Sequence, residues 1–223
     1  MAISPLLARL LAARTARPYQ QFGQASDAYT ANGATGCTHT CAQFVAELYT
    51  GRWWTHDEIS RKIGYPNMSV TSPRRGMTST ELVAFFRAAG LPYVMRTGWT
   101  PAQMLAAARL GPVFVSHLYP WWPEWRGYVY RGVTADGKPN GYATPSGKAG
   151  RTQLSGFSGG HAGLLLGAAG TLVYAWEPNH GSTARPEKPA YDVMSVAQFA
   201  AVATSYQYIP RTSFCYVPTR PPA

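Results

Sequence analysis

Two residues far apart in this sequence have the types and surroundings needed for nucleophilic chemistry. Cys37 follows the turn-forming run 32–36, Asn-Gly-Ala-Thr-Gly, and stands where an apolar helical pattern begins. A helix N-terminus stabilises a thiolate because its unpaired N–H groups and its dipole favour negative charge. His161 follows Ser-Gly-Gly and opens an apolar strand, so its imidazole is suited to take the thiol proton and return it to the leaving group. We predict Cys37 as nucleophile and His161 as base.

A third group must orient the imidazole of such a pair. The strand that follows His161 ends in Trp-Glu-Pro-Asn, which offers Glu177 and Asn179. Either side chain can accept a hydrogen bond from a ring N–H, and both remain candidates.

Other cysteines and histidines compete for these roles. Cys41 lies one turn inside the helix, where its thiol is expected to face the core, and Cys215 is expected to be a core residue. The rival bases are His39, His117 and His180, of which His117 is the strongest because it too stands near a strand end.

A zinc site would need more ligands than this sequence arranges. Cys37, His39 and Cys41 have C-x-x-x-C spacing without a second ligand pair. We therefore expect no metal and no cofactor.

The elements that must position these residues follow from periodicity and capping signals. An apolar helix covers about 40–49, and Thr-x-x-Glu or Ser-x-x-Gln capping boxes start helices at Thr55, Thr78 and Ser195. Thr100 with Pro101 starts another helix. Strands are predicted at 113–118, 162–166, 172–176 and 213–217. Helices thus come first and the sheet second, which suggests a helical lobe facing a sheet lobe.

Length and composition agree with one α+β domain over residues 1–223. Residues 1–16 read as an amphipathic helix rather than a signal peptide, because Arg9 and Arg14 interrupt the apolar run. No later stretch predicts a membrane span. The net charge of +10 attracts polyanions, but the basic residues are scattered, so nucleic-acid binding is not expected as the main function.

The segment around Cys37 resembles a known family. Gly-Cys-Thr-His-Thr-Cys, residues 36–41, before an apolar helix is similar to the nucleophile segment of the bacteriocin-processing cysteine peptidases and their papain-like relatives, which carry Asp-Cys-Gly-x-x-Cys. His161 before an apolar strand resembles their base, and Glu177-Pro178 their Asp-Pro pair sixteen residues later. Residues 105–115, with Gly-Pro-Val at 111–113, resemble their central helix, turn and strand.

The resemblance implies a papain-like fold, with an N-terminal helical lobe packed against a C-terminal antiparallel sheet, and slightly favours Glu177 as the third member. This sequence departs from the family in Thr38, Glu177 and Ala31. Ala31 stands where the oxyanion Gln is expected, so Gln24 is the preferred donor, with Gln21 and Gln20 as alternatives. An oxyanion donor contributes about 3 kcal/mol to transition-state stabilisation.

Residues 119–160 form a long insertion rich in aromatic residues and Gly. Trp121, Trp122 and Trp125 are candidates for stacking on sugar or peptide, or for covering a sheet edge. The sequence also resembles cysteine-peptidase domains of bacteriophages. This likeness implies peptidoglycan peptides as substrate, other virion proteins as partners, and synthesis in the host cytoplasm with action at the cell wall or within a virion.

Two other function classes fit the same sequence. One is a virion structural or tail protein that keeps the fold with little or no turnover. The other is a cell-wall binding module that uses the aromatic insertion.

Overall fold

The computed structural model describes residues 3–16, 37–64, 77–118, 160–176, 178, 191–204 and 214–223. Its helices are α1 (Pro5–Ala16), α2 (Cys37–Thr50), α3 (His56–Lys62), α4 (Ser79–Ala88), α5 (Pro101–Ala107) and α7 (Val196–Ala203). Its strands are β1 (Tyr93–Thr97), β2 (Val113–Leu118), β3 (Gly160–Ala169), β4 (Leu172–Trp176), β5 (Asp192–Ser195) and β6 (Phe214–Pro218).

The strands form one six-stranded sheet in the order β1-β6-β2-β3-β4-β5. Every neighbouring pair is antiparallel, and β2 and β3 lie at the centre. The predicted α+β class, with N-terminal helices packed against an antiparallel sheet, is confirmed. This is the arrangement that the sequence predicted.

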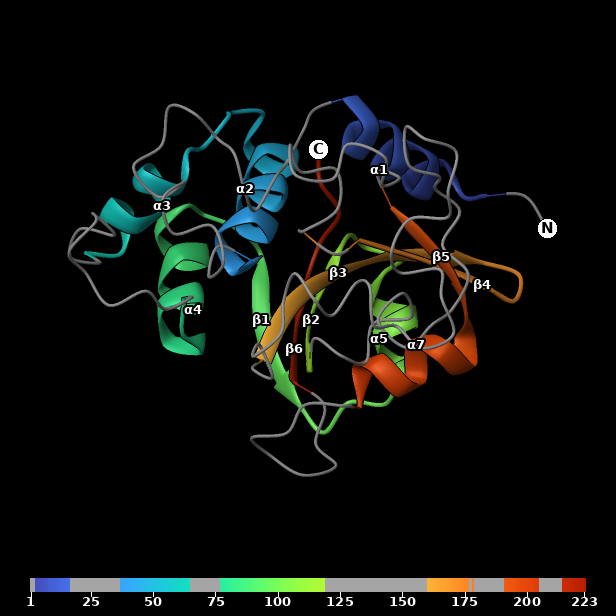
Figure 1. The fold of residues 1–223 in the computed structure, drawn as a ribbon. Coiled ribbons are helices and arrows are strands. Elements are labelled where there is room, and N and C mark those ends of the chain that lie inside the picture. Colours follow the sequence, from blue (N-terminus) through green and yellow to red (C-terminus); the bar gives the residue numbers. More distant parts are fainter. Residues whose placement is uncertain are drawn as a thin grey trace, which may run out of the picture.

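Helices cover both faces of the sheet (Figure 1). On one face, α1, α2, α3 and α4 contribute to a core cluster with the sheet residues Phe114, Leu164, Leu166 and Trp176. On the other face, α5 and α7 pack against Val113, Val115, Leu165 and Val173. We call these the front and back faces. The predicted helices α5 and α7 form the back layer, which exists because the central strands are apolar on both sides.

Local sequence signals explain where several helices begin. Thr55, Thr78, Thr100 and Ser195 each form a capping box with Glu or Gln three residues later. Each box satisfies backbone N–H groups that the helix cannot pair, which contributes about 1 kcal/mol. These predicted helix starts are confirmed.

The predicted order of helices first and sheet second is wrong in one place, because β1 lies between α4 and α5. The position of α7 before β6 agrees with the helix predicted to start at Ser195 and the strand predicted at 213–217. The sequence prediction also missed β1 and β5, which are short and show no regular alternation of buried and exposed residues. Both are edge strands, where one side of the strand needs no partner.

The N-terminal helix α1 packs on β3. Leu7, Leu10 and Leu11 are buried, while Arg9 is exposed. Gly167 lies at the register shift between β3 and β4, and an added Cβ there would lie 3.2 Å from Leu7 Cδ1. Gly167 thus allows close approach of α1 to the sheet. None of the helices in the described residues is long and apolar enough to cross a membrane.

Candidate active site

The predicted nucleophile is the first residue of α2, which confirms that Cys37 stands at a helix N-terminus. Its side chain is largely buried, with 7% exposed, and its Sγ lies 3.8 Å from Thr38 Oγ1. The first ten residues of α2, Cys37–Ala46, are all buried. The start of this helix is therefore enclosed by protein on several sides.

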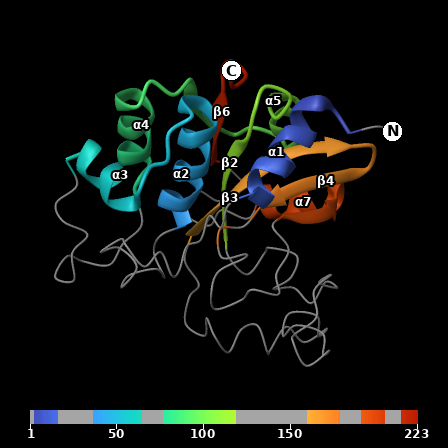
Figure 2. The ribbon, with the colours of Figure 1, turned by 90° about the horizontal axis from the view of Figure 1, so that it is seen from above.

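Cys41 links α2 to the strand that carries the predicted base. Its thiol donates a hydrogen bond to the Ala162 carbonyl oxygen, with 3.7 Å between sulfur and oxygen. Residues four apart share a helix face, so Cys37 lies on this face one turn nearer the helix N-terminus. Ala162 directly follows His161 in β3. Figure 2 shows the N-terminal end of α2 beside the beginning of β3, in agreement with this contact.

The backbone of His161 lies at the start of β3, where its Cα partner in β2 is His117. The two histidines therefore occupy the same end of the central strand pair. The placement of their side chains is outside the described part of the structure. The predicted base and its strongest rival are both near the α2 N-terminus by backbone position, and the choice between them stays a prediction.

The other side of α2 is hydrogen-bonded to α3 through buried polar groups. His39 Nε2 lies 3.1 Å from Ser60 Oγ, and Thr40 Oγ1 lies 3.2 Å from His56 Nε2. All four residues are 3% exposed or less. The imidazole centroids of His39 and His56 are 5.7 Å apart. One turn further along α2, the Gln43 amide donates to the Trp54 carbonyl.

These contacts exclude His39 as an effective base. Burial lowers the pKa of its imidazole to about 3, although Glu81 acts in the opposite direction. Burial, then the neighbouring His39, also lowers the pKa of His56 well below its usual value. A base with so low a pKa has little affinity for a thiol proton at neutral pH. Both histidines thus serve as neutral hydrogen-bonding groups that fix α2 against α3.

The two other cysteines lie where the sequence predicted. Cys41 and Cys215 are fully buried, and no disulfide joins the three cysteines. Burial, only partly offset by Arg96, raises the pKa of the Cys215 thiol to about 12. Cys215 would form little thiolate at neutral pH. Within the ranges that the structure describes, no three His, Cys, Asp or Glu residues form a group able to hold a metal.

Several predicted site residues lie outside the described residues. These are Glu177, Asn179, His180, Gln20, Gln21, Gln24, Trp121, Trp122 and Trp125. Pro178, between the two candidate orienting residues, is described and buried. Gly160, which the sequence assigned to the insertion, belongs to β3. The roles of the undescribed residues stay predictions.

Sequence reasoning missed His56 and Ser60, the two α3 residues that form buried hydrogen bonds with His39 and Thr40 of α2. The capping box at Thr55 located the start of this helix and made His56 its first residue. His56 and Ser60 are four positions apart, so they share one helix face. This spacing was a readable signal, but their partners on α2 become evident only in three dimensions.

Comparison with known proteins concerns the course of the chain only. No protein-family model matches this chain, and none of the curated proteins matches it. A solved structure from Bacillus anthracis, described as that of a candidate C39-like peptidase, has a similar chain trace with a TM-score of 0.47. The two are 14% identical, and the match covers 82% of this chain and 88% of that one. This similarity does not establish a shared activity.

Proposed function

We propose that the protein is a cysteine peptidase in which Cys37 attacks the carbonyl carbon of an amide bond. The observation that carries the proposal is the hydrogen bond from Cys41 to Ala162. It joins the helix that begins at Cys37 to the strand residue directly after His161. This contact supports the proposal because covalent catalysis requires the proposed nucleophile and base, which come from distant segments, to lie close together.

The reaction follows from the groups assigned to this place. The thiol proton passes to the His161 imidazole as sulfur bonds to the carbonyl carbon, and the imidazole then gives that proton to the leaving amine. Water hydrolyses the resulting thioester with the imidazole as base. Glu177 or Asn179 orients the ring, and Gln24 with a backbone N–H stabilises the oxyanion. No step calls for a metal or cofactor.

Peptidoglycan peptides are the proposed substrate class, in a bacteriophage lysis or tail-associated enzyme. This part of the proposal is supported by the resemblance of the sequence to phage peptidase domains and by its net charge of +10, which favours association with acidic cell walls. Trp121, Trp122 and Trp125 are assigned to substrate contacts because flat rings stack on sugars and peptide planes.

Cell-wall zymograms and release of free amines from purified peptidoglycan test the activity. Cys37→Ala should lower the rate at least about a thousandfold, because the variant has no atom to form the thioester. Cys41→Ala is the matched control: it removes a thiol one turn away on the same helix face and should retain activity within about tenfold. Clearing by Cys37→Ala equal to the wild type would refute the nucleophile assignment. An inactive wild type that still binds walls would favour the binding or structural classes.

Two further pairs of variants identify the remaining groups. His161→Ala should abolish turnover, whereas His117→Ala should retain it, and the reverse result would move the base to β2. Glu177→Gln and Asn179→Ala should also have unequal effects. The variant that lacks the residue orienting the imidazole should show the larger loss of kcat. Loss of the orienting group in a catalytic triad can lower kcat about ten-thousandfold, because the imidazole then adopts the wrong tautomer.

A further inference from the structure

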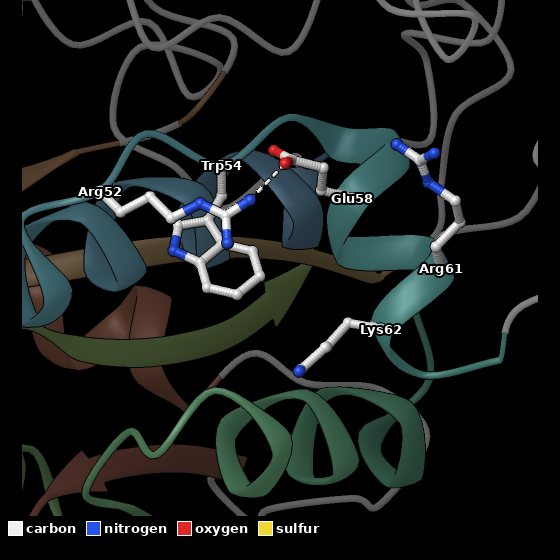
Figure 3. Close-up of a pocket in the computed structure, with 5 residues that line it drawn as sticks. All are labelled: Arg52, Trp54, Glu58, Arg61 and Lys62. Atoms are coloured by element: carbon white, nitrogen blue, oxygen red, sulfur yellow. Dashed lines mark hydrogen bonds and ion pairs between the residues drawn. The ribbon is translucent and has the colours of Figure 1, made fainter.

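A recess lies at the surface of α3 and of the segment that leads into it. It has a volume of about 380 Å³ and is lined by Arg52, Trp54, Glu58, Arg61 and Lys62 (Figure 3). Three cationic side chains and one carboxylate give this recess an excess of positive charge. Its size is within the range of small-ligand sites.

In one half of the recess, the Arg52 guanidinium is held by Trp54 and Glu58. The Arg52 guanidinium lies 4.4 Å from the centroid of the Trp54 ring and forms an ion pair with Glu58. The backbone N–H of Thr55, and then Arg52, keep the pKa of Glu58 below its usual value, so this carboxylate is ionised at neutral pH. Trp54 is itself fixed by Thr50, whose Oγ1 lies 3.2 Å from the indole nitrogen, and by edge contact with Phe85.

The other half of the recess contains Arg61 and Lys62, two cationic side chains with few contacts to the rest of the described fold. Arg61 is exposed and donates from Nε to the Asp57 carbonyl at 3.3 Å, which leaves its two terminal nitrogens for a ligand. Lys62 is exposed, and no acidic side chain of the described residues forms an ion pair with it. Figure 3 shows Lys62 extending from α3 on the Trp54 side of the recess and Arg61 extending from another side of the helix.

This arrangement suits separated negative charges better than one compact dianion. Figure 3 shows Arg61 and Lys62 pointing in different directions, which favours anionic groups spaced along a chain over a single compact phosphate. The Trp54 ring is largely buried and is covered on one face by Arg52, so it adds only a small apolar surface to the recess.

The recess also lies toward the proposed catalytic end of the helical layer. Ser60, next to Arg61, is within 3.1 Å of His39, which is two residues from Cys37. The basic end of α3 therefore lies beside the first turn of α2.

We propose that this recess binds an acidic peptide, with spaced carboxylates contacting Arg61 and Lys62. The choice of a peptide as occupant rests on the proposed function, whereas binding itself requires no turnover. The site therefore selects substrates, or regions of substrates, that carry Asp or Glu residues beyond the cleaved bond.

Binding of a fluorescein-labelled Gly-Glu-Gly-Glu-Gly peptide, followed by anisotropy at low ionic strength, tests this inference. Arg61→Gln with Lys62→Gln should weaken binding about fivefold to tenfold, the size expected for two exposed charge contacts. The matched control is Arg9→Gln with Arg109→Gln, which removes two exposed charges outside the recess and should change binding less than twofold. The Gln counterpart of the peptide should bind the wild type as weakly as the Glu peptide binds the recess variant.

Three results would overturn the inference. Equal weakening in both double variants would mean general attraction to a basic protein, and no weakening in either would mean that the recess does not contact the peptide. Competition by oligothymidylate of equal charge as strong as by unlabelled peptide would assign the recess to phosphodiester chains. Because the assay measures binding, a failure of the proposed hydrolysis in zymograms leaves its outcome unchanged.

Discussion

The two faces of the sheet are covered by helical layers of different chemistry. The front face contains the buried polar residues of the described part of the chain: Thr38, His39, Thr40, Gln43, His56 and Ser60. All of them lie on α2 or α3. The back cluster consists of Met104, Ala108, Phe199, Val202 and sheet residues that are apolar or Cys215.

The difference indicates that hydrogen bonds are concentrated where a helix must be held in one orientation. Hydrophobic contact is not directional, so α5 and α7 can cover the back face without fixing any atom closely. Hydrogen bonds are directional, and burying polar groups for them has a desolvation cost. The fold bears this cost along α2, the helix that begins at Cys37, and on α3, which fixes it.

The largest predicted loss of stability comes from a substitution in the front core, and the matching substitution in the back core should cost less. Phe86, in the front core, has ring centroids of Tyr93, Phe114 and Tyr216 within 4.8, 5.2 and 5.7 Å. Phe86→Ala should lower the free energy of unfolding by about 4 kcal/mol, through cavity formation and loss of edge-to-face contacts. Phe199→Ala, at an equally buried position among mostly aliphatic neighbours, should cost about 1 kcal/mol less. Urea unfolding measures both, and a larger loss at Phe199 would contradict the distinction between the cores.

Acid should destabilise the front face through its two histidines. Above pH 6.5, His39 is neutral in both folded and unfolded chains; below it, the unfolded chain binds a proton that the folded state excludes until about pH 3. His39 alone should therefore lower the free energy of unfolding by roughly 2–3 kcal/mol between pH 7.5 and pH 4.5. His56 acts in the same direction, and Glu81 moderates the effect.

Urea unfolding at several pH values measures this loss. His39→Gln, which keeps a polar side chain without an imidazole, should be less stable at pH 7.5 but should show a smaller loss on acidification. A variant with the same pH dependence as the wild type would mean that His39 takes up a proton in the folded state.

Local signals in the sequence predicted more of this fold than of its site. Helix starts at Thr55, Thr78 and Ser195 were predictable because a capping box is complete within four residues. The position of Cys37 at a helix start followed from the turn before it and the periodicity after it. Strand pairing of β1 with the distant β6 could not be predicted, because the partner of an edge strand is set by tertiary packing.

The buried hydrogen bonds between α2 and α3 could not be predicted from local sequence signals either. His39 was recognised as a candidate base from its residue type, yet its role depends on Ser60 and on complete burial, neither of which has a local signature. The assignment of His161 over His117 rests on a family resemblance, since both backbones lie at the same end of the β2 and β3 pair.

Removing the Ser60 hydroxyl should weaken the buried hydrogen bonding between α2 and α3. Ser60→Ala removes the group 3.1 Å from His39 Nε2 and should cost about 2 kcal/mol, because a buried ring nitrogen loses this hydrogen bond and has no access to water there. Its effect on hydrolysis should be a lower kcat with little change in KM, since the start of α2 is displaced rather than the substrate site. A stability loss below about 0.5 kcal/mol would show that the bond makes no net contribution.

The smallest effect should come from the equivalent substitution on the back face. Ser195→Ala removes the exposed hydroxyl that accepts a hydrogen bond from the Gln198 backbone N–H at the start of α7. The expected cost is about 1 kcal/mol in urea unfolding, because solvent can replace the cap. Hydrolysis should be unaffected, since α7 packs on the sheet face opposite α2. If Ser195→Ala lowered kcat as much as Ser60→Ala, the back layer would also position the active site, and hydrogen bonding along α2 would not be what distinguishes the two faces.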